Sequence, residues 1–198
     1  RGGLAMHTAS MLRLAEACFD HYEGPGQGYC HLDLDTILLG ILFHDSGKLA
    51  ELGETPGQPW TEAGHLAGHI SIGARMWHKV CDVAENEMKQ PAGSFPAKLR
   101  AGVEHIILSH HGELEYGSPV KPKTPEAILV SAIDKMDSGM WTLWSALAGT
   151  EEPAKSWALG GEVFGAPQGP DPLETAQSAP VTLALLPDEA DEKGGDDA

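Results

Sequence analysis

Residues 37–45 read Ile-Leu-Leu-Gly-Ile-Leu-Phe-His-Asp, an apolar run that ends in an imidazole and a carboxylate. The run predicts a buried helix over residues 36–43, with Asp33 or Asp35 as its N-cap. Placing His44 and Asp45 at the end of a buried helix is unfavourable unless something compensates both groups. A divalent metal does so, because it accepts imidazole nitrogen and carboxylate oxygen together. The alternative is a capping aspartate beside a hydrogen-bonded core histidine.

Four further helices are predicted from apolar residues at helical spacing. They cover residues 5–22, 61 to about 80, 98–110 and 125 to about 147. Segments rich in glycine and proline separate them at residues 23–28, 53–59 and 91–96. Because no series of segments alternates in the manner of strands, the predicted fold class is all-α, a helical bundle.

Composition limits the class of protein. The chain has 198 residues, of which 41% are hydrophobic, enough for one domain with a core. No run approaches the roughly 20 apolar residues of a membrane-spanning helix, and no signal peptide opens the chain. Cys18, Cys30 and Cys81 form no CxxC pair, which argues against a disulfide framework or a thiolate zinc site. We therefore expect a cytoplasmic protein that does not contact a membrane.

The charge is strongly negative and unevenly distributed. The formal net charge is −16, and residues 150–198 alone hold 11 acidic and 2 basic residues. We expect a domain over residues 1–149, followed by a Pro-, Gly- and acid-rich extension or flexible tail over residues 150–198. No basic face is present to neutralise many phosphates, so contact with nucleic acid would depend on bound cations or another domain. Arg1 opens the chain in place of a methionine, which suggests a fragment or a trimmed product, and a missing upstream domain is left open.

Histidines and one aspartate mark the candidate site. Asp134 lies in an apolar helical run, where an unpaired carboxylate is unfavourable. Helical bundles build metal sites from inward-facing side chains on facing helices. Besides the helix that ends in His44-Asp45, four predicted helices offer such groups at apolar-to-polar junctions: His7, His65 and His69, His110-His111, and Asp134.

The order of these residues resembles the HD superfamily of metal-dependent phosphohydrolases. Gly47 and Lys48 complete a His-Asp-x-Gly-Lys motif. Further motifs are similar to the HD domain of the YhaM-type 3′-to-5′ exoribonucleases: Gly2-Gly3-Leu4 before His7, Gly68-His69-Ile70, and Ser109-His110-His111-Gly112-Glu113 leading to Gly117-Ser118-Pro119. In that group an OB-fold domain precedes the HD domain, and such folds grip single strands by stacking and a positive groove.

The resemblance implies a ligand set. His7, His44, Asp45 and Asp134 would bind a first metal, and Asp45 would bridge to a second held by His69 and His110. His111 is an alternative ligand, or a donor to a substrate phosphate.

Roles outside that ligand set stay open. Lys48 is either a phosphate anchor or a surface lysine, and Tyr116 either stacks on a base or simply packs in its loop. His65 is either a supporting group or a surface histidine. We therefore take Asp45, Lys48 and His111 as candidate catalytic residues, and Lys48, His111 and Tyr116 as candidates for substrate binding.

Imidazoles mixed with carboxylates favour one or two divalent ions, manganese or iron foremost, with cobalt, nickel or magnesium as substitutes. A water activated to hydroxide by such ions would attack phosphorus. The expected substrate is RNA or a short oligonucleotide, cleaved from its 3′ end, with the missing OB-fold domain helping to hold the strand. Alternatives are a nucleotide phosphohydrolase acting on a nucleoside mono- or triphosphate or a cyclic nucleotide, and a non-catalytic helical metal-binding module. Monomer and oligomer are both left open.

Overall fold

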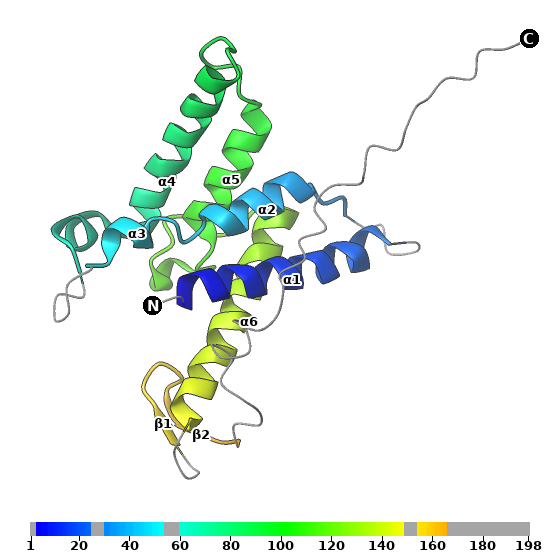
Figure 1. The fold of residues 1–198 in the computed structure, drawn as a ribbon. Helices are drawn as coiled ribbons and strands as arrows, with labels where there is room; N and C mark the ends of the chain where they lie inside the picture. The colour runs from blue at the N-terminus through cyan, green and yellow to red at the C-terminus, as the bar shows by residue number, and fades with distance from the viewer. Residues whose placement is uncertain (1–2, 25–29, 54–59, 149–153, 166–198) are drawn as a thin grey trace, which may run out of the picture. The chain divides into compact units, whose positions relative to one another are not determined.

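The computed structural model describes residues 3–24, 30–53, 60–148 and 154–165. The helices dominate, and the all-α prediction is confirmed (Figure 1). In chain order the elements are α1 (Gly3–Glu23), α2 (Leu34–Phe43), α3 (Lys48–Glu51), α4 (Glu62–Glu87), α5 (Ala97–Ser109), the 3-10 helix η1 (Leu114–Tyr116), α6 (Pro125–Leu147), β1 (Ala154–Ser156) and β2 (Gly161–Val163). The five predicted helices are present, and α3, η1 and the two strands were not predicted.

Side chains just before the helices fix where three of them begin. The Asp33 carboxylate accepts a hydrogen bond from the Thr36 amide at 2.8 Å, so Asp33 rather than Asp35 is the N-cap of α2. Thr61 caps α4 by accepting from the Gly64 amide at 2.9 Å. Thr124 caps α6, whose first residue is Pro125.

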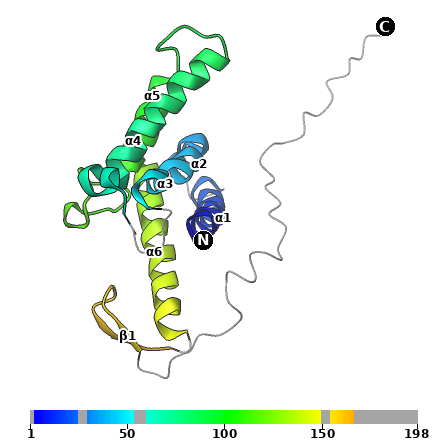
Figure 2. The ribbon, with the colours of Figure 1, turned by 60° about the vertical axis from the view of Figure 1, so that its left-hand side comes forward.

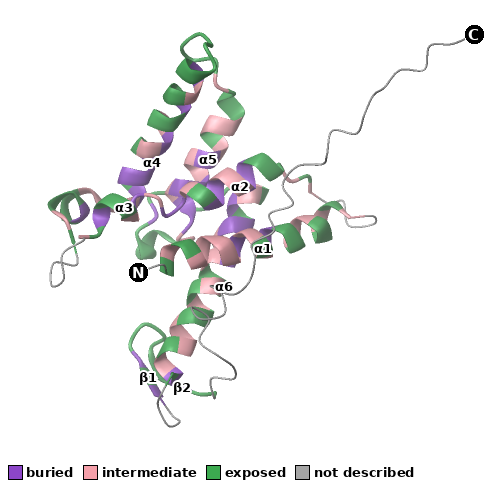
Figure 3. Ribbon diagram, viewed as in Figure 1, coloured by how far each residue is buried: buried purple, intermediate pink, exposed green. Residues whose placement is uncertain are grey.

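The core lies where the helices cross. α1 packs against α2 and α6, and α5 packs against α2, α4 and α6. The main cluster joins α1, α2, α5 and α6, and buried residues are concentrated around α2, α5 and α6 (Figure 3). Its fully buried members include Met11, Ile37, Ile41, Ile106 and Val130. A second cluster around Trp77 and Ile107 joins α4 to α5. The packing brings the first turn of α1, the end of α2, the end of α5 and the middle of α6 toward one region.

Helix α4 extends seven residues beyond the predicted end near Val80 and is kinked at Gly68. Gly68 has φ 67° and ψ 155°, a conformation that is essentially restricted to glycine. The helix restarts at His69, whose amide donates to the Glu51 carboxylate at 2.8 Å. Glu51 therefore caps the second segment of α4 from a different helix.

A short antiparallel hairpin follows α6, with Ala154 paired to Val163 (Figure 2). Ala154 and Val163 are buried against Leu147 near the end of α6. The hairpin lies within the segment predicted as an extension or tail, so part of that segment folds onto the helices. Residues 166–198 lie outside the described residues, and the domain boundary near residue 149 stays a prediction. Among the described helices, none is both long and apolar enough to cross a membrane.

Candidate metal centre

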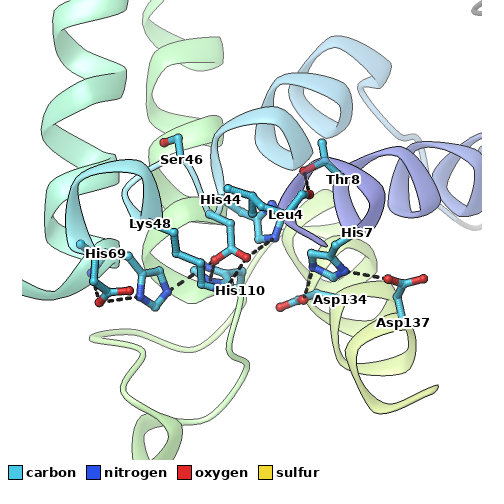
Figure 4. Close-up of polar contacts among 12 residues, drawn as sticks. Leu4, His7, Thr8, His44, Ser46, Lys48, His69, His110, Asp134 and Asp137 are labelled. Carbon is cyan, nitrogen blue, oxygen red and sulfur yellow. Dashed lines mark hydrogen bonds and ion pairs between the residues drawn. The ribbon is translucent and has the colours of Figure 1, made fainter. Parts of the chain in front are cut away.

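Six of the predicted ligands converge in two groups, each drawn from several helices. His7, His44 and Asp134 form one group, and His69, His110 and His111 form the other. Within each group the candidate ligand atoms all lie within 4.8 Å of one another. Figure 4 shows His7, His44, His110 and Asp134 pointing toward one another from α1, the end of α2, the end of α5 and α6. We call them the His7 group and the His69 group.

Asp45 lies between the two groups. Its Oδ2 atom is 3.4 Å from His44 Nε2, on the side of the His7 group. Its Oδ1 atom is 3.6 Å from His69 Nε2 and 3.7 Å from His110 Nε2, on the side of the His69 group. One carboxylate thus presents one oxygen to each group, which is the arrangement that a bridging ligand requires.

Backbone carbonyls orient three of the histidine rings. His44 and His110 follow the last residues of α2 and α5 and act as their C-caps. Each ring donates from Nδ1 to the carbonyl three residues earlier, at 2.7 Å to Ile41 and 2.8 Å to Ile107. His111 Nδ1 donates to the Tyr116 carbonyl at 2.7 Å. Because Nδ1 carries the proton in each case, Nε2 keeps its lone pair for a metal.

Carboxylates orient the other two rings, and neither carboxylate was singled out from the sequence. His7 Nδ1 lies 2.7 Å from Asp137 Oδ2, while His7 Nε2 faces Asp134 at 3.1 Å (Figure 4). His69 Nδ1 lies 3.2 Å from Glu51 Oε1. The available signal for Asp137 was its position three residues after Asp134, on the same face of α6. Glu51 gave no comparable signal, because it is a charged residue in a short polar segment and its burial depends on α4.

The glycine of the His-Asp-x-Gly-Lys motif holds the Asp45 loop against α4. A Cβ atom built at Gly47 would lie 2.0 Å from the carbonyl oxygen of His69. Any other residue would push apart the backbones that carry Asp45 and His69, so glycine at this position permits the short distance between the two ligands.

Burial and neighbouring charges set the protonation of the site. Burial lowers the pKa of His110 to about 3, and it also lowers the pKa of His69 against the opposing charges of Asp45 and Glu51. Burial by itself would raise the pKa of Asp45, but its close contacts with the His44 ring and the Lys48 ammonium hold that pKa far below its usual value. The pKa of Asp134 is likewise lowered, since its hydrogen bond with His7 and nearby imidazoles outweigh burial. The lowered pKa values of His69 and His110 favour neutral imidazoles, and those of Asp45 and Asp134 favour ionised carboxylates, which are the forms that divalent metals bind.

The unsatisfied atoms of the site fit a metal. His44 Nε2, Asp45 Oδ1, His69 Nε2 and His110 Nε2 are buried and have no hydrogen-bond partner among the described residues. Buried polar atoms are normally paired, and these four atoms all lie at the two groups. A pair of divalent cations, one at each group with Asp45 between them, would satisfy all four.

The remaining predicted site residues lie around the rim. Lys48 Nζ is 2.6 Å from Asp45 Oδ2, and its side chain is about one-third exposed. Tyr116 is exposed on the loop that carries η1, after the two histidines. His65 is exposed, with its ring 6.1 Å from that of Trp60, and belongs to neither group. Four-residue spacing from His69 does not place His65 on the same face, because the Gly68 kink intervenes.

Comparison with known proteins agrees with this geometry. The family model of the HD domain matches residues 4–139. The chain belongs to the HD domain family. The predicted resemblance is therefore confirmed, and with it the class of metal-dependent phosphohydrolases; HD domains bind divalent metals.

Two curated relatives are both named 3′-5′ exoribonuclease YhaM. The protein from Bacillus velezensis is 36% identical over 145 residues, which cover 73% of this chain and 41% of the relative. The protein from Bacillus subtilis is 36% identical over 138 residues, covering 70% of this chain and 39% of the relative. The chain thus spans about two-fifths of the length of these relatives. No solved structure matches it at a significant level.

Proposed function

We propose that this HD domain hydrolyses phosphodiester bonds in RNA or short oligonucleotides, stepwise from the 3′ end, using two divalent cations. One observation carries the proposal: Asp45 presents its two oxygens to two separate groups of ligands, on opposite sides of one carboxylate. Single-metal and purely structural sites do not need a carboxylate shared in this way. Two-metal centres use it to hold both ions close to one phosphate.

His7, His44, Asp45 and Asp134 would hold one cation, and His69, His110, His111 and Asp45 the other. When bound, such cations supply a water that loses its proton near neutral pH and they stabilise negative charge on phosphoryl oxygens. The mixture of imidazole and carboxylate donors favours manganese or iron.

The protein's own groups then handle charge and position. Lys48 keeps Asp45 ionised and lies at the surface of the site, where its amine can also face a phosphate oxygen. His111 is less buried than His110, and its ring centre lies 4.4 Å from that of His110, so His111 can act as a metal ligand or contact a substrate phosphate. In the reaction an oxygen from water bonds to phosphorus, the bond from phosphorus to the leaving sugar oxygen breaks, and that oxygen gains a proton.

RNA is favoured as substrate over a free nucleotide because two relatives carry the exoribonuclease name over the aligned region. The chain itself carries net charge −16, so affinity for a polyanion depends on local cations such as the lysines of the site, and bound metal ions or an OB-fold domain would each add to it.

The test begins with metal analysis of the purified chain and hydrolysis of bis-p-nitrophenyl phosphate with manganese added. We expect bound metal and release of nitrophenol, and we expect both to be lost in Asp45→Asn. Glu85→Gln is the matched control, because Glu85 is a buried carboxylate that accepts two backbone amides away from the site.

A labelled single-stranded RNA is then compared with a panel of mononucleotides and cyclic nucleotides. A ladder that shortens from the 3′ end supports the proposal. Turnover of a single nucleotide with no RNA cleavage would identify a nucleotide phosphohydrolase instead, and absence of both metal and turnover would leave a non-catalytic module.

A further inference from the structure

A small pocket of about 200 Å³ opens beside the metal ligands. It is lined by His110, His111, Tyr116, Asp134, Lys135 and Ser138. Asp134 belongs to the His7 group, whereas His110 and His111 belong to the His69 group, so the pocket borders both. A substrate group that occupies it lies next to the phosphate that the two groups would hold.

Lys135 is a cation at this pocket without a carboxylate partner within the described part of the chain. The other lysines near the site are engaged: Lys48 contacts Asp45, and Lys121 forms an ion pair with Glu113 at 2.5 Å. Lys135 is exposed, and its ammonium lies 5.9 Å from the centre of the Tyr116 ring, a cation–π contact that holds it at the rim. Because the protein as a whole is strongly negative, the Lys135 ammonium beside the metal ligands would attract an anionic substrate to this pocket in particular.

Tyr116 supplies the other half of the pocket. Its side chain is 56% exposed even though it lies one loop away from buried His110. Its backbone carbonyl fixes the His111 ring, so the position of the tyrosine is tied to that of a site histidine. An exposed aromatic ring is a platform on which any nucleobase can stack, and a lysine next to it can contact the adjoining phosphate.

We propose that Tyr116 and Lys135 form a nucleotide subsite, in which the base next to the cleaved bond stacks on Tyr116 and its phosphate contacts Lys135. This inference rests on the proposed function, since it assigns part of the RNA substrate to a position beside the metal centre. The subsite would bind a base and a phosphate without sequence specificity, because every base can stack on an aromatic ring.

The test measures binding of a fluorescein-labelled six-nucleotide single-stranded RNA by fluorescence anisotropy in EDTA, at several salt concentrations, and RNA cleavage with manganese. Lys135→Met should weaken binding and lower the slope of log affinity against log salt by about 0.7, the value for one phosphate on a single strand. Lys98→Met is the matched control, since Lys98 is exposed near the start of α5, at the other end of that helix from His110. It removes the same charge and should lower the slope less.

Tyr116→Leu should weaken binding by roughly 5- to 150-fold, the range for loss of one base–aromatic stack, and Tyr116→Phe should restore it. The leucine keeps the backbone carbonyl that fixes His111, and manganese binding measured by calorimetry should match that of the unchanged protein in every variant.

Equal slopes for Lys135→Met and Lys98→Met, or equal affinities for Tyr116→Leu and Tyr116→Phe, would overturn the subsite. So would a failure of the unchanged protein to bind RNA. If the unchanged protein binds RNA with these dependences but cleaves none with manganese, the subsite stands and the proposed hydrolysis is wrong.

Discussion

Glu51 offers the sharpest test of how the metal centre is held. Its buried Oε1 atom accepts from the amide of His69 at 2.8 Å and from His69 Nδ1 at 3.2 Å. One oxygen thus caps the second segment of α4 and sets the tautomer of the His69 ring. Removing the negative charge should weaken the metal ligand without emptying the rest of the site.

The expected magnitudes follow from those two hydrogen bonds. Glu51→Gln keeps an oxygen that can accept from the His69 amide, but it removes the negative charge next to Nδ1 of the His69 ring. The affinity for one manganese ion should therefore fall by roughly 10- to 100-fold. Glu51→Ala leaves both donors of His69 unpaired, and each unpaired buried donor costs about 1–3 kcal/mol of the free energy of unfolding. The alanine variant should therefore lose both stability and metal affinity, whereas the glutamine variant should lose chiefly metal affinity.

Isothermal titration with manganese and urea unfolding of the metal-free protein separate the two effects. Glu85→Gln is the matched control: Glu85 is equally buried and accepts from the amides of Gly93 and Phe95 at 2.8 and 2.6 Å. It should change stability and leave manganese binding alone. If Glu51→Gln binds manganese as tightly as the unchanged protein, the carboxylate does not tune His69 and our account of its role is wrong.

Three further perturbations have definite expected outcomes. Gly68→Ala forces a side chain into a backbone conformation restricted to glycine, so it should lower the free energy of unfolding by about 1–3 kcal/mol and also weaken manganese binding. Gly93→Ala, also at positive φ, should lower stability without changing manganese binding, as urea unfolding and isothermal titration would show. Manganese at 100 times its dissociation constant should stabilise the fold by about 2.7 kcal/mol, raising the melting temperature by about 5–10 °C in calorimetry, and EDTA or Asp45→Asn should abolish the shift. In EDTA the protein should lose stability as pH falls below 6.5, because His110 takes up a proton in the unfolded chain but not in the folded one. With a folded pKa of about 3, His110 should lower the free energy of unfolding by about 2 kcal/mol at pH 5. Urea unfolding of His110→Asn should show a smaller decrease in that free energy between pH 7 and 5. The lowered pKa of His69 also destabilises the fold as pH falls, whereas the raised pKa of His7 has the opposite effect. A free energy of unfolding that is constant between pH 7 and 5 in both the unchanged protein and His110→Asn would contradict the proposal that burial lowers the pKa of His110.

The sequence predicted the helices well because their apolar residues repeat at helical spacing over long stretches. Helix α6 begins and ends where the pattern indicated, with Thr124 and Pro125 at its start. Short elements were missed: α3 is a single turn whose helical state depends on packing against α4. The kink at Gly68 was missed as well, since a glycine within a helical pattern does not by itself predict a bend, and the Glu51 carboxylate that receives the His69 amide there lies on a different helix.

The candidate ligands were predictable because each is a polar group where none is expected. His44 and Asp45 end an apolar helix, and Asp134 interrupts another, so burial and ionisation conflict within the sequence itself. Supporting groups do not produce such a conflict. Glu51 occupies a position that resembles ordinary polar surface, and Asp137 is marked only by its spacing from Asp134, so the three-dimensional packing is what makes them partners of His69 and His7. The same holds for Lys135, whose importance depends on the Tyr116 loop lying beside it.

The pKa shifts of the histidines differ between the two groups, and the difference affects how each group would bind metal. In the His69 group burial lowers the pKa of both His69 and His110, so these ligands are already neutral when a cation arrives. In the His7 group burial also disfavours the charged imidazole, but Asp134 and Asp137 outweigh it and raise the pKa of His7. Because that pKa is raised, a cation that binds this group competes with a proton on His7 up to higher pH, and once bound it is the positive partner of Asp134. Metal binding at the His7 group should therefore depend more steeply on pH than metal binding at the His69 group. Binding at one group should affect binding at the other through the ionised Asp45 carboxylate, which faces both groups.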